Sequence, residues 1–141
     1  MMSGIRGKNT APELVIRRGL HARGFRFRLH ARHLKGSPDI ILPKFRAVIF
    51  VHGCFWHGHD CHLFRIPSTR PEFWIGKIAR NAARDAEALS TLNSAGWRSL
   101  VVWECALRGR SKLDPDLLMG EIAEWLRSNR RHRDLGGRRH E

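Results

Sequence analysis

The sequence predicts an α/β domain in which a mixed central β-sheet is flanked by helices. Short apolar runs with β-branched residues, typical of buried strands, alternate with segments of helical periodicity. Hydrophobic residues make up 42% of the 141 positions, which is enough for one core and excludes wholesale disorder. No apolar run approaches the ~20 residues that a membrane-spanning helix needs. We therefore expect one soluble domain.

The first predicted element is a helix that follows a basic arm over residues 1–9. Thr10 can cap this helix, Pro12 lies in its first turn, and the Glu13 carboxylate can complete a capping box. Gly24 ends it, since glycine is the preferred residue after a helix.

Three strands are expected next. Residues 25–29 alternate apolar and basic side chains, a period of two that indicates one buried face. Residues 39–42 and 46–51 are short apolar runs joined through a proline turn, and they predict a buried hairpin. Residues 52–70, rich in histidine, cysteine and glycine, are expected to be irregular.

The second half of the chain predicts a helix, a strand and a helix. Residues 71–94 form the first helix, whose basic stripe contacts phosphates or is simply solvated: Lys77, Arg80 and Arg84. Residues 99–103 form a buried strand, and a last helix is capped at Asp114. We expect the domain to span residues 1–126 and residues 127–141 to be a disordered basic tail.

Charge and cysteine content restrict the partners and the compartment. There are 26 Lys and Arg against 13 Asp and Glu, a net charge of +13 that attracts polyanions, nucleic acid above all. A merely basic or ribosome-like protein is the alternative, and charge does not distinguish binding from cleavage. Three cysteines without a secretion signal indicate an intracellular protein with metal ligands or buried thiols rather than disulfides.

A metal site is predicted where four histidines and two cysteines crowd into residues 52–62. Three of the four donors that tetrahedral zinc needs come from this loop: Cys54, His59 and Cys61. The fourth is His62 or Cys105. We favour Cys105 because it and Cys54 both follow buried strands, whose ends meet if the strands are neighbours. With four protein ligands the zinc would be structural; the alternative is a buried thiol beside histidines that bind nothing.

A second centre is predicted at the start of the hairpin. Asp39 opens one strand and His52 ends the next, so the two strands can hold a carboxylate, a backbone carbonyl and an imidazole around one point. Oxygen ligands of this kind suit Mg²⁺, which polarises a phosphodiester and activates water. His57 or His52 could accept the proton of that water.

Several segments of the chain closely resemble the very-short-patch-repair (Vsr) DNA mismatch endonucleases. They are IRGKNTAPE (5–13), GSPD (36–39), VIFVHGCFWH (48–57), TRPEFW (69–74) and VWECALRGR (102–110). The resemblance spans about residues 1–126 and implies the restriction-endonuclease-like fold, a variant of the PD-(D/E)xK nucleases. It implies Mg²⁺-dependent nicking of duplex DNA on the 5′ side of the thymine in a T·G mismatch, the product of 5-methylcytosine deamination.

Position by position, the resemblance also implies roles for individual residues. Asp39 would bind Mg²⁺ with its side chain, and Val51 with its backbone carbonyl. His57 would be the general base, His52 would assist around the phosphate and the water, and Glu13 would be a supporting acid or only a helix cap. The zinc ligands would be Cys54, His59, Cys61 and Cys105. The residues inserted into the base stack would be Met2, Phe55 and Trp56.

Three departures from the family pattern stand out. Val51 replaces a frequent threonine, the arm before Met2 is short, and His62 is a surplus imidazole. Two alternatives stay open: a zinc-stabilised DNA-binding module without catalysis, and a nuclease of the same fold with another specificity. We expect a monomer in the cytoplasm, associated with the nucleoid, because an asymmetric mismatch needs one active centre.

Overall fold

The computed structural model describes residues 10–138, and the predicted arm with Met2 lies outside this range. Within this described range, three helices and five strands follow one another as α1 (Ala11–Ala22), β1 (Arg28–Leu29), β2 (Ile40–Leu42), β3 (Ala47–His52), α2 (Pro71–Ser94), β4 (Arg98–Trp103), α3 (Pro115–Leu126) and β5 (His132–Leu135). Short 3-10 turns follow β2 and β4 at Pro43–Phe45 and Glu104–Ala106.

The strands form one mixed sheet in the order β1-β2-β3-β4-β5. The first three strands are antiparallel neighbours, whereas β3, β4 and β5 run parallel. In the β3–β4 ladder His52 lies opposite Trp103, so the two strands end at the same edge of the sheet. The predicted mixed α/β fold is confirmed, and so is the adjacency of the strands that precede Cys54 and Cys105.

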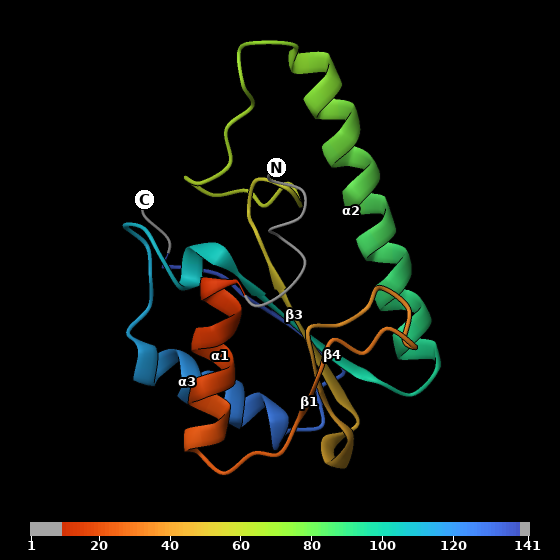
Figure 1. The fold of residues 1–141 in the computed structure, drawn as a ribbon, viewed down its shortest axis with the longest axis vertical. Helices are drawn as coiled ribbons and strands as arrows, with labels where there is room; N and C mark the ends of the chain where they lie inside the picture. Colours follow the sequence, from red (N-terminus) through yellow and green to blue (C-terminus); the bar gives the residue numbers. More distant parts are fainter. Residues whose placement is uncertain (1–9, 139–141) are drawn as a thin grey trace.

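Side chains that alternate along the strands pack into two hydrophobic cores, one on each face of the sheet. Ile49 and Leu100 point to the face covered by α1 and α3, where Trp125 is fully buried. Val48 and Val101 point to the opposite face and pack with Leu92 of α2. Figure 1 shows α1 and α3 side by side and the N-terminal half of α2 extending beyond the sheet.

Two of the predicted elements differ in detail. The strand expected over residues 25–29 pairs only at Arg28–Leu29, because the backbone N–H of Phe25 donates to Leu20 at the end of α1 instead of to the sheet. The helical periodicity of residues 71–94 predicts Ala82 on the inward face of α2, but its side chain is exposed.

The prediction of a disordered tail is wrong for the residues that form β5. The main reason is Arg98, whose guanidinium donates to the carbonyls of Trp125, Leu126 and Arg130 and stacks over the Trp125 ring at 4.5 Å. These bonds hold the chain after α3 against β4, and Leu135 joins the core at 5% exposure. We infer that the folded unit continues past residue 126.

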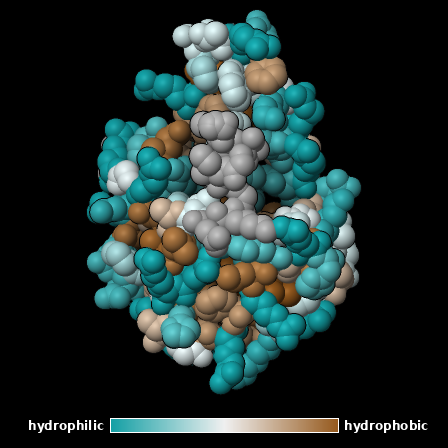
Figure 2. All heavy atoms as spheres, viewed as in Figure 1, coloured by the Kyte–Doolittle hydropathy of each residue, from teal (hydrophilic) through white to brown (hydrophobic). Residues whose placement is uncertain are grey.

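The surface is dominated by hydrophilic side chains on the face shown in Figure 2, with hydrophobic patches between them. Within residues 10–138, no helix combines the length and the apolar character needed to cross a membrane.

Candidate active site and metal centre

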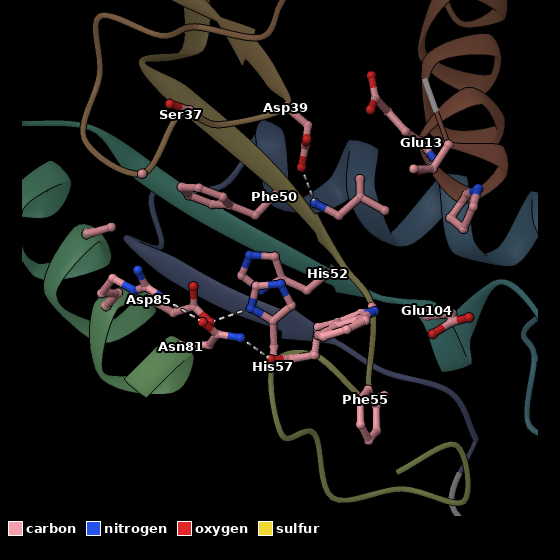
Figure 3. Close-up of a pocket in the computed structure, with 18 of the residues that line it drawn as sticks. Glu13, Ser37, Asp39, Phe50, His52, Phe55, His57, Asn81, Asp85 and Glu104 are labelled. Atoms are coloured by element: carbon pink, nitrogen blue, oxygen red, sulfur yellow. Dashed lines mark hydrogen bonds and ion pairs between the residues drawn. The ribbon is translucent and has the colours of Figure 1, made fainter. Parts of the chain in front are cut away.

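One cavity of about 1000 Å³ brings together all four predicted catalytic side chains. Glu13 comes from α1, Asp39 immediately precedes β2, His52 ends β3 and His57 lies in the loop that follows. Figure 3 shows them around the same space. The opposite wall is α2. Residues far apart in the sequence therefore meet where β2 begins and β3 ends.

Asp39 is held in place by the neighbouring strand. Its N–H donates to the Ile49 carbonyl at 3.1 Å, and its Oδ2 accepts the N–H of Val51 at 2.7 Å. Within residues 10–138, no hydrogen bond reaches Oδ1. Burial raises the pKa of Asp39 to about 6, against the lowering effect of the Val51 N–H. The carboxylate is thus oriented but poorly solvated, so a cation in the cavity would stabilise its charge.

His52 and His57 form a parallel pair of imidazoles. Their ring centroids lie 3.8 Å apart with planes inclined by 3°, and Trp103 meets the His52 ring edge-on at 5.3 Å. His52 is 8% exposed, and burial followed by repulsion from His57 lowers its pKa to about 3. His52 is therefore a neutral hydrogen-bonding group at physiological pH, not a cation.

The low pKa of His52 makes acid stability a measurable property of this site. In the unfolded chain His52 takes up a proton near pH 6.5, whereas in the folded chain it stays neutral down to about pH 3. The contribution of neutral His52 to the free energy of unfolding is therefore complete above pH 6.5 and is lost as pH falls. We expect a loss of about 2 kcal/mol in the free energy of unfolding at pH 5. Denaturant titrations of wild type and His52→Gln should converge as pH falls; a pH-independent difference would contradict this.

Asp85 of α2 orients His57 and is absent from the sequence prediction. Its Oδ2 lies 2.5 Å from Nδ1 of His57, and Figure 3 draws this contact. The sequence contains one signal for it: Asp85 stands one helical turn after Asn81 and two turns after Lys77, and all three line the cavity. Only the packing of α2 beside the loop brings Asp85 next to His57, which lies 28 residues earlier in the chain.

Glu13 is nearly fully buried, at 1% exposure. Its Oε2 lies 2.8 Å from Nε2 of His30 and 3.3 Å from the guanidinium of Arg17, and its charge helps to raise the pKa of Asp39. Thr10 caps the helix as predicted, because its side chain accepts the N–H of Glu13 at 3.3 Å. The Glu13 carboxylate is thus part of the electrostatics of the cavity.

The predicted aromatic wedge lies at the rim of the same cavity. Phe55 and Trp56 are half-buried, with ring centroids 5.2 Å apart, and each packs against Trp74 of α2. The Trp56 carbonyl accepts a hydrogen bond from Asn81 at 3.0 Å. Two large rings thus lie beside the predicted catalytic side chains and pack from one side against α2.

Basic side chains complete the lining. From the predicted stripe, Lys77 and Arg84 line the cavity, together with Arg108 after β4. Arg80 is exposed on the same helix but is not among the lining residues. The lining of the cavity therefore combines cations with carboxylates.

The four predicted zinc ligands converge beside the loop of residues 53–70, called the His/Cys loop below. One ligand atom from each lies within 4.8 Å of all the others: Cys54, His59, Cys61 and Cys105. Nδ1 of His59 is 3.5 Å from the sulfurs of both Cys54 and Cys105. Three thiols and one imidazole are a donor set for a soft divalent metal, so this cluster could bind a metal such as zinc.

Hydrogen bonds and ring stacking connect the side chains of the cluster. A hydrogen bond with the Cys54 thiol lowers the pKa of Cys105 to about 5, and the same bond raises the pKa of Cys54. The ring of Trp103 stacks on His59 at 4.2 Å. His62 is not one of the four; its Nδ1 lies 3.4 Å from the Ser111 hydroxyl.

Comparisons with known proteins give consistent matches. A family model described as DNA mismatch endonuclease Vsr matches residues 1–63. The chain is 46% identical over 125 residues to the DNA mismatch endonuclease Vsr of Escherichia coli, covering 89% of this chain and 80% of that protein. It is 47% identical over 117 residues to the type II nicking enzyme V.XorIIP of Xanthomonas oryzae pv. oryzae, covering 83% and 86% of the two chains. It is 40% identical over 111 residues to the type II nicking enzyme V.NmeAIP of Neisseria meningitidis, covering 79% of each.

Proposed function

Because the chain belongs to the DNA mismatch endonuclease Vsr family, we propose that it nicks duplex DNA 5′ to the thymine of T·G mismatches by Mg²⁺-dependent hydrolysis. The observation that carries this proposal is the grouping of Asp39, His52, His57 and Asp85 in one cavity with cationic walls. The family relation supports a DNA substrate, and the cavity supports hydrolysis.

Asp39 and the Val51 carbonyl are the groups that would hold Mg²⁺. The buried carboxylate, with Oδ2 held by the Val51 N–H, fits a hard cation that takes its other ligands from water and phosphate. The ion would polarise the phosphoryl oxygens and lower the pKa of the attacking water. Valine at position 51 keeps the carbonyl, so replacing the family's threonine leaves this role intact.

His57 is the proposed general base. Its Nδ1 faces Asp85 at 2.5 Å, which fixes the ring and stabilises the imidazolium that forms when Nε2 takes the proton of the attacking water. His52, stacked on His57 and neutral, would orient the phosphate or the water by a hydrogen bond. Glu13 would support the site through its charge near Asp39.

Mismatch selectivity is proposed to come from the aromatic rim. Phe55 and Trp56 would enter the base stack beside the mismatch, with Met2 of the arm as a further inserted side chain. Unstacking costs a few kcal/mol and least at a weakened pair, so insertion favours T·G over matched DNA. Lys77, Arg84 and Arg108 would contact the phosphates.

The Cys/His cluster is proposed to hold a structural Zn²⁺. Four protein donors leave no open coordination position, so the ion would fix the loop that carries His57 and the aromatic pair. We propose a monomer acting on DNA in the cytoplasm and expect no role for His62 in metal binding.

A nicking assay distinguishes this function from the two alternatives. Wild type and Asp39→Ala are incubated with Mg²⁺ and a set of duplexes that differ at one position only. This position carries a T·G mismatch, the correctly paired C·G or another mispair. The proposal expects nicking of the T·G duplex by wild type alone. Equal nicking of every duplex would indicate a nuclease of other specificity, and binding without nicking of any duplex would indicate a DNA-binding module.

Removing the carboxylate behind His57 should slow the reaction without changing DNA binding. In Asp85→Asn the imidazole keeps a neighbour of the same shape but loses the charge that stabilises its protonated form. We expect a fall of about 100-fold in the single-turnover nicking rate and an unchanged Kd for the T·G duplex. Glu87→Gln, a charge-matched change at an exposed position of α2, is the control. An unchanged rate in Asp85→Asn would remove Asp85 from the site.

A further inference from the structure

The chain beyond β5 lies directly against the metal cluster. The N–H of Gly137 donates to the sulfur of Cys105 at 3.2 Å, and the N–H of Arg138 donates to the Ser111 carbonyl at 2.7 Å. The Ser111 hydroxyl in turn donates to the Cys105 carbonyl at 3.2 Å. A second cavity, of about 590 Å³, is bounded by the cluster on one side and by residues 136–138 on the other.

Glycine is required where this segment passes Cys105. A Cβ at Gly137 would lie 2.4 Å from the Cys105 carbonyl oxygen and 2.6 Å from that of Ser111, and neither backbone atom can move aside cheaply. A Cβ at Gly136 would lie 3.3 Å from Cε1 of His59. The two glycines thus let the backbone approach two of the four predicted metal ligands.

The sheet fixes the position of this segment. Leu135 pairs with Val102 in the β4–β5 ladder, which places the following glycines beside the end of β4. Asp134 accepts a hydrogen bond from the Trp103 indole at 3.1 Å, and the Trp103 ring stacks on His59. The residues that follow β5 thus contact Cys105 directly, through the Gly137 amide. Asp134 of β5 is linked to His59 through the Trp103 ring.

We propose that residues 134–138 form the outer wall of the metal centre, with the Gly137 N–H as a positioning group for the Cys105 thiolate. An N–H directed at a ligating sulfur spreads its negative charge and holds its orientation, and groups in this position commonly change metal affinity by about 10–100-fold. The covering backbone also limits the access of water and chelators. The inference rests on the proposed zinc site.

The test measures how fast zinc leaves the full chain. Zinc-loaded wild type, Gly137→Ala and Gly120→Ala are mixed with an excess of a chromogenic chelator, and zinc release is followed by absorbance. Gly120 is the matched control because a Cβ there, in α3, meets nothing within 4 Å. We expect release to be about 10-fold faster or more for Gly137→Ala and unchanged for Gly120→Ala. Equal rates for the two variants would overturn the proposal.

A truncation pair keeps the test decisive if Gly137→Ala fails to fold. A chain that ends at Gly136 keeps β5 and the buried Leu135 but lacks the Gly137 N–H. A chain that ends at Arg138 keeps β5 and this N–H. With folding checked by circular dichroism, faster release from the shorter chain alone supports the proposal, and equal release overturns it. Wild type that binds no zinc would refute the metal assignment itself, a result distinct from zinc-loaded chains with equal rates.

Discussion

Asp39→Asn should abolish nicking and at the same time stabilise the fold. Asparagine keeps an acceptor for the Val51 N–H but brings no charge for a cation, so we expect the nicking rate to fall by about three orders of magnitude or more. The pKa of Asp39 is about 6 in the folded chain and 3.8 in the unfolded chain. The free energy of unfolding of the wild type therefore falls as pH rises from 4 to 6 and Asp39 ionises. At pH 7 the variant should gain about 1–3 kcal/mol.

Denaturant titration of the zinc-loaded proteins without Mg²⁺, at pH 4 and pH 7, checks the second half of this prediction. The difference between Asp39→Asn and wild type should be present at pH 7 and nearly absent at pH 4, and Mg²⁺ should stabilise only the wild type. Asp60→Asn, a change at an exposed acid in the loop, is the control. A variant that is less stable than wild type at pH 7 would show that the carboxylate is well stabilised without a metal.

Cys105→Ser should remove zinc and most of the stability of the His/Cys loop. The loop has few buried apolar side chains between residues 52 and 70, so the metal would replace a core there. Losing one of four ligands in a structural site costs several kcal/mol, which for a chain of this size lowers Tm by about 10 °C or more.

His62→Gln is the matched control for this variant. It changes a neighbouring imidazole that lies outside the four-residue cluster, so zinc content and Tm should both stay at the wild-type level. Elemental analysis and thermal scans of the purified proteins give both quantities. One zinc per chain in Cys105→Ser, or loss of zinc in His62→Gln, would contradict the prediction and indicate that His62 is the fourth ligand instead of Cys105.

Local patterns were sufficient for most of the fold. Short apolar runs located β2, β3 and β4, and the caps at Thr10 and Asp114 located the starts of α1 and α3. The convergence of Cys54 and Cys105 followed from one topological assumption, that their strands are neighbours. The parallel ladder between β3 and β4 confirms it. Where the residues themselves prefer one local structure, sequence reasoning succeeded.

The features that sequence reasoning missed depend on contacts between distant segments. The β5 residues His132–Leu135 are mostly polar, so no apolar pattern marks them as a strand. They are ordered because Arg98 binds carbonyls that become available only once α3 has packed. Asp85 looks like one more charge on an exposed helix until α2 is placed beside His57. Both need the tertiary structure before they acquire a role.

The most direct test of the central claim is to map the nick on a T·G duplex labelled separately on each strand. Asp39 and the His52–His57 pair line one cavity, to which the proposed function assigns a single phosphodiester. With Mg²⁺, a single product should appear, from the thymine strand and cut at the phosphate 5′ to the mismatched thymine, and EDTA should abolish it. Cleavage of both strands, cleavage elsewhere, or the same product in EDTA would contradict the account.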